Sequence, residues 1–392
     1  MGIGVNATKR IALHFNRTRA YGRGFCEGVA SWTEKRPEWR LEMVENLGAL
    51  KGYDGVIAHV MNGKEAEDLA SLGIPVVADF YRESCCNLAQ ALPDHAAIGR
   101  MAADFFRERG FVNFAFCGYD GILFSDARRE GFKAALEEAK LGAIIYKTPK
   151  AALENFDNRV ILREALVPEA VDLPELAAWL AALPKPCAVF CCHDLRAYQV
   201  LCAAKEARLK TPGDIAIVGV DNDALVCSFA SPRITSIDNN AFACGRAAME
   251  LLDDIMAGRA KRNEVRKIAP LGVVARESSE VFNYSSPILN EALMFMRRNI
   301  ANNLTASEII EHTGKSHTLV ETLFKTELGT TVQNELKRLR VEEAKRLLMM
   351  TSIPLDEVAK RSGYSSLRYF TIAFSAAERV TPAEFRKTQR RN

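Results

Sequence analysis

The sequence predicts a two-lobed α/β body built on parallel sheets, followed by a separate all-α domain. Short apolar strands alternate with longer helical patterns from residue 9 to about residue 277, as in parallel sheets covered by helices on both faces. This stretch is longer than one sheet usually holds, so we expect two lobes with crossing connections. After Pro287 the pattern is helical, with no convincing strand.

The strand candidates are short apolar runs, and the helix candidates between them are amphipathic. The predicted strands are Arg10–Phe15, Gly55–His59, Pro75–Asp79, Asn113–Cys117, Gly142–Tyr146, Ala188–Cys192, Ala216–Val220 and Gly272–Ala275. The predicted helices include Gly22–Thr33, Ala97–Gly110, Arg128–Lys140 and Leu195–Arg208.

Composition and charge both change near residue 279. A polar, Ser-rich stretch ends in Pro287, which can start a helix. We therefore predict a body over residues 1–278, a linker over 279–287 and a helical domain over 288–392. From Ser285 onward there are 17 basic and 12 acidic residues, whereas the remainder has 35 and 37. A basic end on a slightly acidic body indicates a nucleic-acid-binding domain.

The cysteines and the N-terminus point to a reducing compartment. Ten cysteines lie at positions 26, 85, 86, 117, 187, 191, 192, 202, 227 and 244, mostly in apolar runs and without a Cys-x-x-Cys pair, so free thiols are expected. Cys191, Cys192 and His193 could imitate a metal site, but adjacent strand residues point to opposite faces. No metal, cofactor or membrane span is expected, and without a signal peptide the chain should be cytoplasmic.

The helical domain contains an internal repeat. In each copy a short helix stops at a glycine, and a serine then caps a second helix. The first copy has the capping box Thr305 with Glu308, then Gly314 and Ser316; the second has a helix from Leu355, then Gly363 and Ser365 or Ser366. A long helical pattern, Thr331–Met350, separates the copies, and Thr381-Pro382-Ala383-Glu384 supplies a last capping box. Two helix-turn-helix units at a fixed spacing are therefore predicted.

The last 105 residues, roughly, resemble AraC-type transcription regulators. The likeness is carried by Leu355-Asp356-Glu357-Val358-Ala359, Gly363-Tyr364-Ser365-Ser366, Tyr369-Phe370, Phe374, Thr381-Pro382 and Phe385-Arg386. The chain departs from the family at 376–380, where basic residues and a glycine are usual, and this affects backbone geometry and phosphate contact. By position, the resemblance implies recognition helices that expose His317, Thr318, Glu321 and Thr322 in the first copy and Leu367, Arg368 and Thr371 in the second.

The residue types on these helices suit contact with base edges in a major groove. Arg368 could pair with guanine, Glu321 could accept from cytosine, and Leu367 could touch a thymine methyl group. The alternative for each position is an ordinary solvated side chain.

The body has polar residues where its predicted strands end. His193 and Asp194 follow one strand, Asp221 and Asn222 follow another, and Arg128 begins a helix beyond a third. Ligands of parallel sheets sit at the carboxyl ends of the strands. Carboxylates and a guanidinium at such an edge suit a polyhydroxylated ligand, whose hydroxyl groups donate and accept.

Residues 9–279 resemble the effector-binding core of lac-repressor-type regulators, which is related to periplasmic sugar-binding proteins. The likeness is carried by Asp194-Leu195, Pro212, Asp214 to Asp223, Pro232, Thr235-Ser236-Ile237 and Arg276-Glu277-Ser278. Such a core joined to an AraC-type tail is the arrangement of the xylose-operon regulator group. The resemblance places Asp94, Arg128, His193 and Asp221 at the ligand, and Tyr21 and Arg23 could close over it.

Each of these assignments has a structural alternative. Asp221 could belong to a turn and helix cap, Asp94 could cap the helix from Ala97, and His193 could serve local structure. His193 also stands where the wider family often has asparagine, so the ligand could differ.

Together these features predict a sequence-specific DNA-binding transcription regulator with no catalytic residues. The resemblance implies an activator of sugar-catabolic genes that is controlled by a monosaccharide, with D-xylose as the first candidate. The expected partners are a double-stranded DNA operator, a second copy in a homodimer and RNA polymerase. A regulator of a non-xylose small molecule is the alternative. A sugar-processing enzyme is more remote because no nucleotide-binding loop or nucleophile motif is present. A solute-binding protein would need an export signal and would have no use for the C-terminal repeat.

Overall fold

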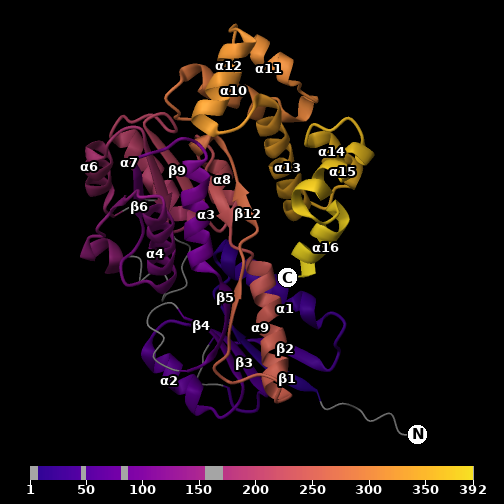
Figure 1. Ribbon diagram of the computed structural model, residues 1–392. Coiled ribbons are helices and arrows are strands. Elements are labelled where there is room, and N and C mark those ends of the chain that lie inside the picture. The colour runs from indigo at the N-terminus through magenta and orange to yellow at the C-terminus, as the bar shows by residue number, and fades with distance from the viewer. Residues whose placement is uncertain (1–7, 46–49, 81–86, 155–170, 392) are drawn as a thin grey trace. The chain divides into compact units, whose positions relative to one another are not determined.

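The computed structural model describes residues 8–45, 50–80, 87–154 and 171–391. The chain separates into two compact units, each described by itself (Figure 1). The first consists of Met1–Asp104 with Asn113–Ser278, and the second of Phe105–Val112 with Ser279–Asn392.

The first lobe of the first unit is a parallel sheet covered by three helices. Its strands, in spatial order, are β11 (Val265–Ile268), β5 (Ala89–Pro93), β4 (Val76–Phe80), β3 (Gly55–Val60), β1 (Lys9–His14) and β2 (Trp39–Met43). All neighbouring strands pair in parallel. The helices are α1 (Ala20–Thr33), α2 (Gly63–Ser71) and α9 (Ala241–Met256). Apolar residues of α1 and α9 pack with those of β1, β3, β4 and β5.

The second lobe repeats this plan with one antiparallel edge. Its strands run in the order β12 (Gly272–Val274), β10 (Thr235–Asp238), β9 (Ile215–Val220), β8 (Cys187–Cys191), β6 (Phe114–Cys117) and β7 (Ala143–Ile145), with β12 antiparallel to β10. Strands β8 and β9 are buried along their whole length, as expected where helices cover both faces. The helices are α3 (His95–Arg107), α4 (Leu123–Glu138), α6 (Leu173–Ala182), α7 (Asp194–Glu206) and α8 (Ala224–Phe229).

The chain passes between the two lobes three times, after β5, after β10 and after β11. The predicted α/β class with two lobes and crossing connections is therefore confirmed. These crossings bring the carboxyl ends of both sheets to the junction between the lobes.

The second unit is built from helices in its described part. They are α10 (Pro287–Arg298), α11 (Ala306–His312), α12 (His317–Leu328), α13 (Val332–Met350), α14 (Leu355–Arg361), α15 (Leu367–Glu378) and α16 (Pro382–Arg391), with a short 3-10 turn at Ile300–Asn302. Another 3-10 turn, Glu277–Ser279, spans the boundary between the units. Helix α13 contributes to two apolar cores, one shared with α10–α12 and one with α14–α16.

Eight cysteines lie within the described residues and are free thiols there. Cys85 and Cys86 lie outside the described residues. Across the described chain, no helix has both the length and the apolar character needed to cross a membrane.

Candidate functional site

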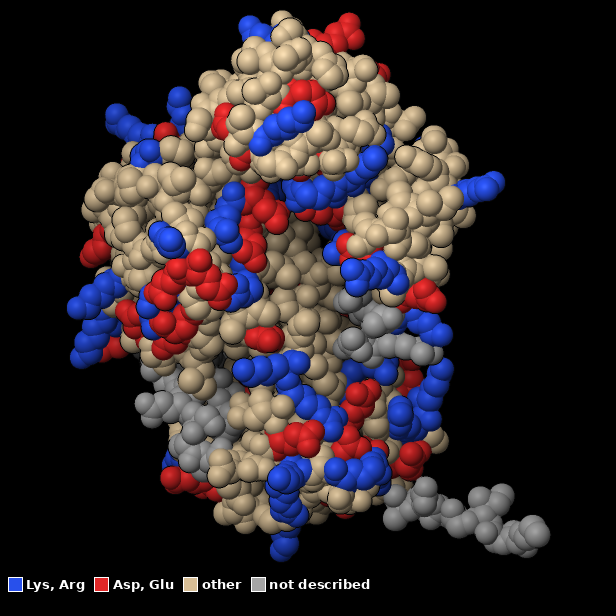
Figure 2. All heavy atoms as spheres, in the orientation of Figure 1, with Lys and Arg blue, Asp and Glu red and all other residues tan. Residues whose placement is uncertain are grey.

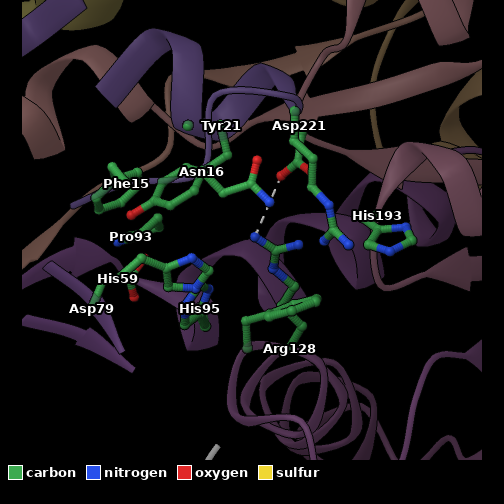
Figure 3. A pocket seen from close by; sticks show the side chains of 13 residues that line it. Phe15, Asn16, Tyr21, His59, Asp79, Pro93, His95, Arg128, His193 and Asp221 are labelled. Carbon is green, nitrogen blue, oxygen red and sulfur yellow. Dashed lines mark ion pairs between the residues drawn. The ribbon is translucent and has the colours of Figure 1, made fainter. Parts of the chain in front are cut away.

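The loops after the strands of both lobes enclose one cavity, seen in Figure 3. Its empty volume is about 670 Å³, including the part open to solvent, within the range of small-molecule sites. The first lobe contributes Phe15, Asn16, Arg19, Tyr21, Gly22, His59 and Asp79; Pro93 and His95 stand at the first crossing; the second lobe contributes Phe124, Arg128, His193 and Asp221.

Most of these side chains stand at the carboxyl end of a strand, or just beyond it. Phe15 follows β1, His59 and Asp79 lie near the ends of β3 and β4, and Asp221 follows β9. At this edge the backbone leaves the sheet, so side chains can converge without breaking the ladder.

Aromatic rings form part of the wall on each side of the cavity. On the first lobe Phe15 stacks on Phe25 at 4.2 Å and on His59 at 5.4 Å between ring centroids. On the second lobe Phe124 stacks on His193 at 6.0 Å, and the Arg128 guanidinium lies 5.1 Å from the Phe124 ring centre. The rings give the cavity apolar surfaces next to its charged groups.

Arg128 and Asp221 form an ion pair at the second lobe. Their Nη2 and Oδ1 atoms are 3.6 Å apart, and Arg128 is only 3% exposed (Figure 3). Arg128 also donates to the carbonyl of Cys192, and the Asn239 amide donates to Asp221 Oδ1 at 2.7 Å. These bonds hold the guanidinium and the carboxylate in place before any ligand enters.

The backbone at Asp221 is in the left-handed region, with φ of 104°. Non-glycine residues rarely adopt this conformation, so the surrounding structure must impose it. Asp194 holds the loop that follows Asp221, because Ser236 Oγ donates to its Oδ1 at 2.5 Å and the Asp223 amide donates to its Oδ2 at 2.7 Å. At Gly219 an added Cβ would lie 2.3 Å from Asp194 Oδ1, so only glycine lets this carboxylate approach the strand.

The two carboxyl groups in the cavity are harder to ionise than usual. Burial raises the pKa of Asp79 to about 7, partly opposed by Tyr21 and Arg128. Burial likewise raises the pKa of Asp221 to about 6, partly opposed by Arg128 and Arg19. Near neutral pH the cavity therefore holds carboxyl groups close to their titration points, which is common at functional sites.

Two histidines contribute neutral rings. Burial and the nearby Arg128 lower the pKa of His95, and its Nδ1 has no hydrogen-bond partner among the described residues. Burial also lowers the pKa of His193, whose Nδ1 accepts from the Arg196 amide at 2.9 Å. Because a neutral imidazole has one donor and one acceptor, His193 carries its proton on Nε2.

Four of the predicted ligand residues, Tyr21, Arg128, His193 and Asp221, line this cavity. His193 also caps α7, so it has a local structural role besides its place in the cavity wall, and its contact with a ligand stays a prediction. The cap of α8 is Asp223 and not Asp221, because Asp223 Oδ1 accepts from the Leu225 and Val226 amides.

Arg23 and Asp94 are not among the lining residues. Arg23 is exposed on α1 and pairs with Asp223 of the second lobe at 3.3 Å, so it joins the lobes beside the cavity. The Asp94 carboxylate accepts from the Ala97 amide at 3.0 Å and caps α3. Ligand contact by these two residues stays a prediction.

Sequence reasoning missed nine lining residues: Phe15, Asn16, Arg19, Gly22, His59, Asp79, Pro93, His95 and Phe124. Three of these residues could have been predicted from their position at the end of a strand. Phe15, His59 and Asp79 each end a strand that the sequence predicted, and the rule that selected His193 and Asp221 selects them as well.

The second unit contains two helix-turn-helix units. In the first, Thr305 and Glu308 form the capping box of α11, Gly314 has φ of 62°, and Ser316 Oγ accepts from the Leu319 amide at 3.3 Å. In the second, Gly363 has φ of 77°, and Ser366, not Ser365, accepts from the Tyr369 amide at 3.2 Å. The predicted caps are thus present in both copies.

The residues expected to contact DNA lie on α12 and α15. His317, Thr318, Thr322, Leu367 and Arg368 are exposed, whereas Glu321 and Thr371 are half-buried. On the same helices Val320, Phe324, Phe370 and Phe374 are buried. Each second helix therefore has an apolar side that packs in the domain and an exposed side, as recognition helices do. Base contact by each of the seven residues stays a prediction.

Comparison with known proteins agrees with both halves of this description. Residues 103–279 match the periplasmic binding protein-like domain, and residues 309–388 match a helix-turn-helix domain. The xylose operon regulatory protein of Escherichia coli (strain K12) is 25% identical over 391 residues, covering 96% of each chain. That of Haemophilus influenzae (strain ATCC 51907 / DSM 11121 / KW20 / Rd) is 25% identical, covering 96% of this chain and 98% of the relative.

A solved structure of a xylose-binding transcription activator has the same fold, with a TM-score of 0.59, 24% identity and coverage of 97% of this chain and 98% of that one. These relatives are transcription regulators and not enzymes. The chain is thus a homologue of the xylose operon regulatory proteins, a transcription regulator that joins a periplasmic-binding-protein-like domain to an AraC-type helix-turn-helix domain.

Proposed function

We propose that this protein is a sugar-controlled activator of sugar-catabolic genes, with D-xylose as the first candidate effector. The observation that carries the proposal is the meeting of two carboxyl groups, two arginines and aromatic rings in one cavity between the lobes. Sugar hydroxyl groups donate to carboxylates and accept from guanidinium and imidazole N–H groups. The aromatic faces suit the apolar C–H surface of a sugar ring.

The choice of D-xylose rests on homology. The relatives that span almost the whole chain are named for the xylose operon, at 25% identity. The cavity chemistry suits other monosaccharides equally well, so a different sugar is the main alternative. We assign ligand contact to Tyr21, Arg128, His193 and Asp221, and add Asp79 and His95.

For the DNA side, we propose a homodimer that binds a double-stranded operator in the cytoplasm and contacts RNA polymerase there. Recognition helices that read successive major grooves on one face of DNA are about 34 Å apart. Each protomer would present two such helices, α12 and α15, joined by α13.

The ligand would act by favouring the closed arrangement of the two lobes. A sugar that touches Asp79 on one lobe and Asp221 on the other binds the closed state more tightly, and only such differential affinity can shift the equilibrium. The Arg23–Asp223 pair at 3.3 Å joins the same two lobes and would stabilise closure.

The first test is the thermal stability of the purified protein with a panel of monosaccharides. A ligand that binds only the folded state raises Tm by mass action. An increase with D-xylose alone supports the full proposal. An increase with another sugar replaces D-xylose as the effector, and no increase with any sugar contradicts a sugar effector while leaving DNA binding untouched.

Asp221→Ala is expected to weaken sugar binding by about tenfold to a hundredfold, as for loss of a charge-assisted hydrogen bond. Sugar affinity is measured by calorimetry and DNA affinity without sugar by fluorescence anisotropy. DNA affinity should be unchanged.

Asp68→Ala is the matched control, because Asp68 is exposed on α2 and outside the cavity. If Asp221→Ala folds normally but loses DNA binding without sugar, the division into a sensing and a DNA-reading part is wrong.

A further inference from the structure

The two helix-turn-helix copies give each position on α12 a counterpart on α15. Ser316 and Ser366 cap these helices, and Phe324 and Phe374 are the buried anchors eight residues later. In this register His317 corresponds to Leu367, Thr318 to Arg368, Glu321 to Thr371 and Thr322 to Ile372. Three of the four expected base-reading positions on α15 were already assigned, and the fourth is Ile372.

Burial supports the same correspondence. Glu321 and Thr371 are both half-buried, whereas Thr322 and Ile372 are both exposed. Ile372 is 58% exposed and lies on the side of α15 opposite the buried Phe370 and Phe374. Leu367, in the first turn of the helix, is 43% exposed. An exposed isoleucine on a helix surface that is expected to meet DNA is a candidate for apolar contact.

The threonines of these helices offer methyl groups more than hydroxyl groups. Thr371 Oγ1 donates to the Leu367 carbonyl at 2.9 Å, and Thr322 Oγ1 donates to the Thr318 carbonyl at 2.8 Å. Because each hydroxyl hydrogen is bonded within its own helix, the methyl group is the main part of each threonine side chain that is left for contact with DNA.

Charge is sparse on α15. Arg368 and Glu378 are its charged residues, and the surface over α14 and α15 is mostly uncharged on the face drawn in Figure 2. Apart from Arg368 and the hydroxyl groups of Ser365 and Tyr369, the exposed side chains near the start of α15 have little capacity for hydrogen bonds to base edges. The one feature of the major groove that an aliphatic side chain matches is the C5-methyl group of thymine.

We propose that α15 recognises thymine methyl groups and that Ile372 is a specificity-determining residue of this helix, beside Leu367. Arg368 would supply the polar contact, so the preferred sequence under α15 combines thymines with a guanine. This inference rests on the proposed DNA-binding function and specifies the chemistry of the DNA that the second copy prefers.

The test begins with the full-length protein and its preferred sugar, used to enrich a randomised DNA duplex. In the enriched duplex, thymines are replaced one at a time by deoxyuridine, which removes only the methyl group. Loss of a contacted methyl should weaken binding by about fourfold, the value for one buried methyl-sized group. In Ile372→Ala the penalty at the position read by Ile372 should disappear, because the side chain that covers the methyl is gone.

Two controls test whether the effect comes from the Ile372 side chain itself. Val380→Ala removes an exposed apolar residue that follows α15 and should leave every uracil penalty unchanged. Because Ile372 is exposed, Ile372→Ala should keep the Tm of the parent protein.

Failure of the inference and failure of the proposed function give different results. If no sequence is enriched and no duplex binds, sequence-specific DNA binding is wrong and the inference falls with it. If a duplex is enriched but the uracil penalties are equal in the parent and in Ile372→Ala at every position, Ile372 does not read thymine. The exposed face of α15 would then serve a protein partner.

Discussion

Asp79 and Asp221 face the sugar cavity from different lobes, and their pKa values of about 7 and about 6 make ligand binding depend on pH. A sugar hydroxyl donates best to an ionised carboxylate, so binding favours the ionised form and lowers the pKa of both groups. Protons are then released on binding. Affinity must therefore rise as pH rises from about 5 to about 8, and level off above the higher pKa.

We predict that sugar affinity increases by about tenfold or more between pH 5.5 and pH 8, since each pKa unit corresponds to about 1.4 kcal/mol. Calorimetry at several pH values, in buffers of different ionisation enthalpy, measures both affinity and proton release. Asp79→Asn should remove the part of the dependence near pH 7 and keep the part near pH 6. Affinity that is flat or falls with rising pH would show that the sugar prefers the protonated carboxyl groups.

Single residues could be assigned from sequence where a strand end was visible. His193 and Asp221 follow strongly apolar strands, so their place at the cavity was predictable. Pro93 and His95 were not, because Pro93 ends β5 and His95 lies just beyond it, and the sequence of this strand, Ala-Gln-Ala-Leu-Pro, is too mixed to recognise. Arg19 and Phe124 stand on loops or helix starts whose geometry depends on lobe packing, which no local pattern contains.

At the scale of elements, the crossing of α1 and α9 depends on two glycines, each of which faces the backbone of the other helix. A Cβ at Gly245 would lie 1.9 Å from the carbonyl oxygen of Phe25, and one at Gly28 would lie 2.0 Å from that of Phe242. The neighbours are backbone atoms and cannot move aside alone. The two helices approach this closely because both positions lack a side chain.

We expect Gly245→Ala to destabilise the protein by about 1–3 kcal/mol through overpacking, despite the gain in helix propensity of up to about 1 kcal/mol. The Tm should fall by several degrees in thermal unfolding followed by circular dichroism. Gly142→Ala is the control, because no atom lies within 4 Å of a Cβ there. Equal Tm values for the two variants would mean that α1 and α9 can separate at no cost.

The predicted strands were the strongly apolar ones. The four strands that were not predicted are less apolar or shorter. Strands β2 and β11 are sheet edges that carry two charged residues each, and β5 ends in a proline. Strand β10 is only Thr235–Asp238, yet it is buried because β9 and β12 flank it. These segments form strands because they pair with residues that are distant in the sequence, and a short stretch of sequence does not contain this information.

At the scale of the whole molecule, α3 begins in the first unit and ends in the second. It starts at the cavity, where His95 is a lining residue, and packs closely on α4, where a Cβ at Gly99 would lie 2.2 Å from the Arg128 carbonyl oxygen. Its last residues belong to the second unit. There the Asn283 amide donates to the Arg109 carbonyl at 2.7 Å, and Tyr284 Oη donates to the Glu108 carbonyl at 2.7 Å.

We predict that α3 carries the effect of sugar to the DNA-reading helices. Insertion of two glycines between Asp104 and Phe105 interrupts the helix where it passes from one unit to the other, while the contacts at each of its ends can persist. Sugar affinity without DNA and DNA affinity without sugar should then stay within about twofold of the parent protein. The factor by which sugar changes DNA affinity, typically about 5–150-fold for such coupling, should fall toward one.

The same insertion after Gly258, in an exposed turn with no atom within 4 Å of a Cβ, is the control and should keep the coupling. Because coupling is reciprocal, DNA must change sugar affinity by the same factor in each variant, which gives a second measurement of one quantity. If the insertion in α3 leaves both factors at the parent value, the signal travels through the 279–287 segment instead. A continuous α3 would then be needed only for the stability of the two units that it joins.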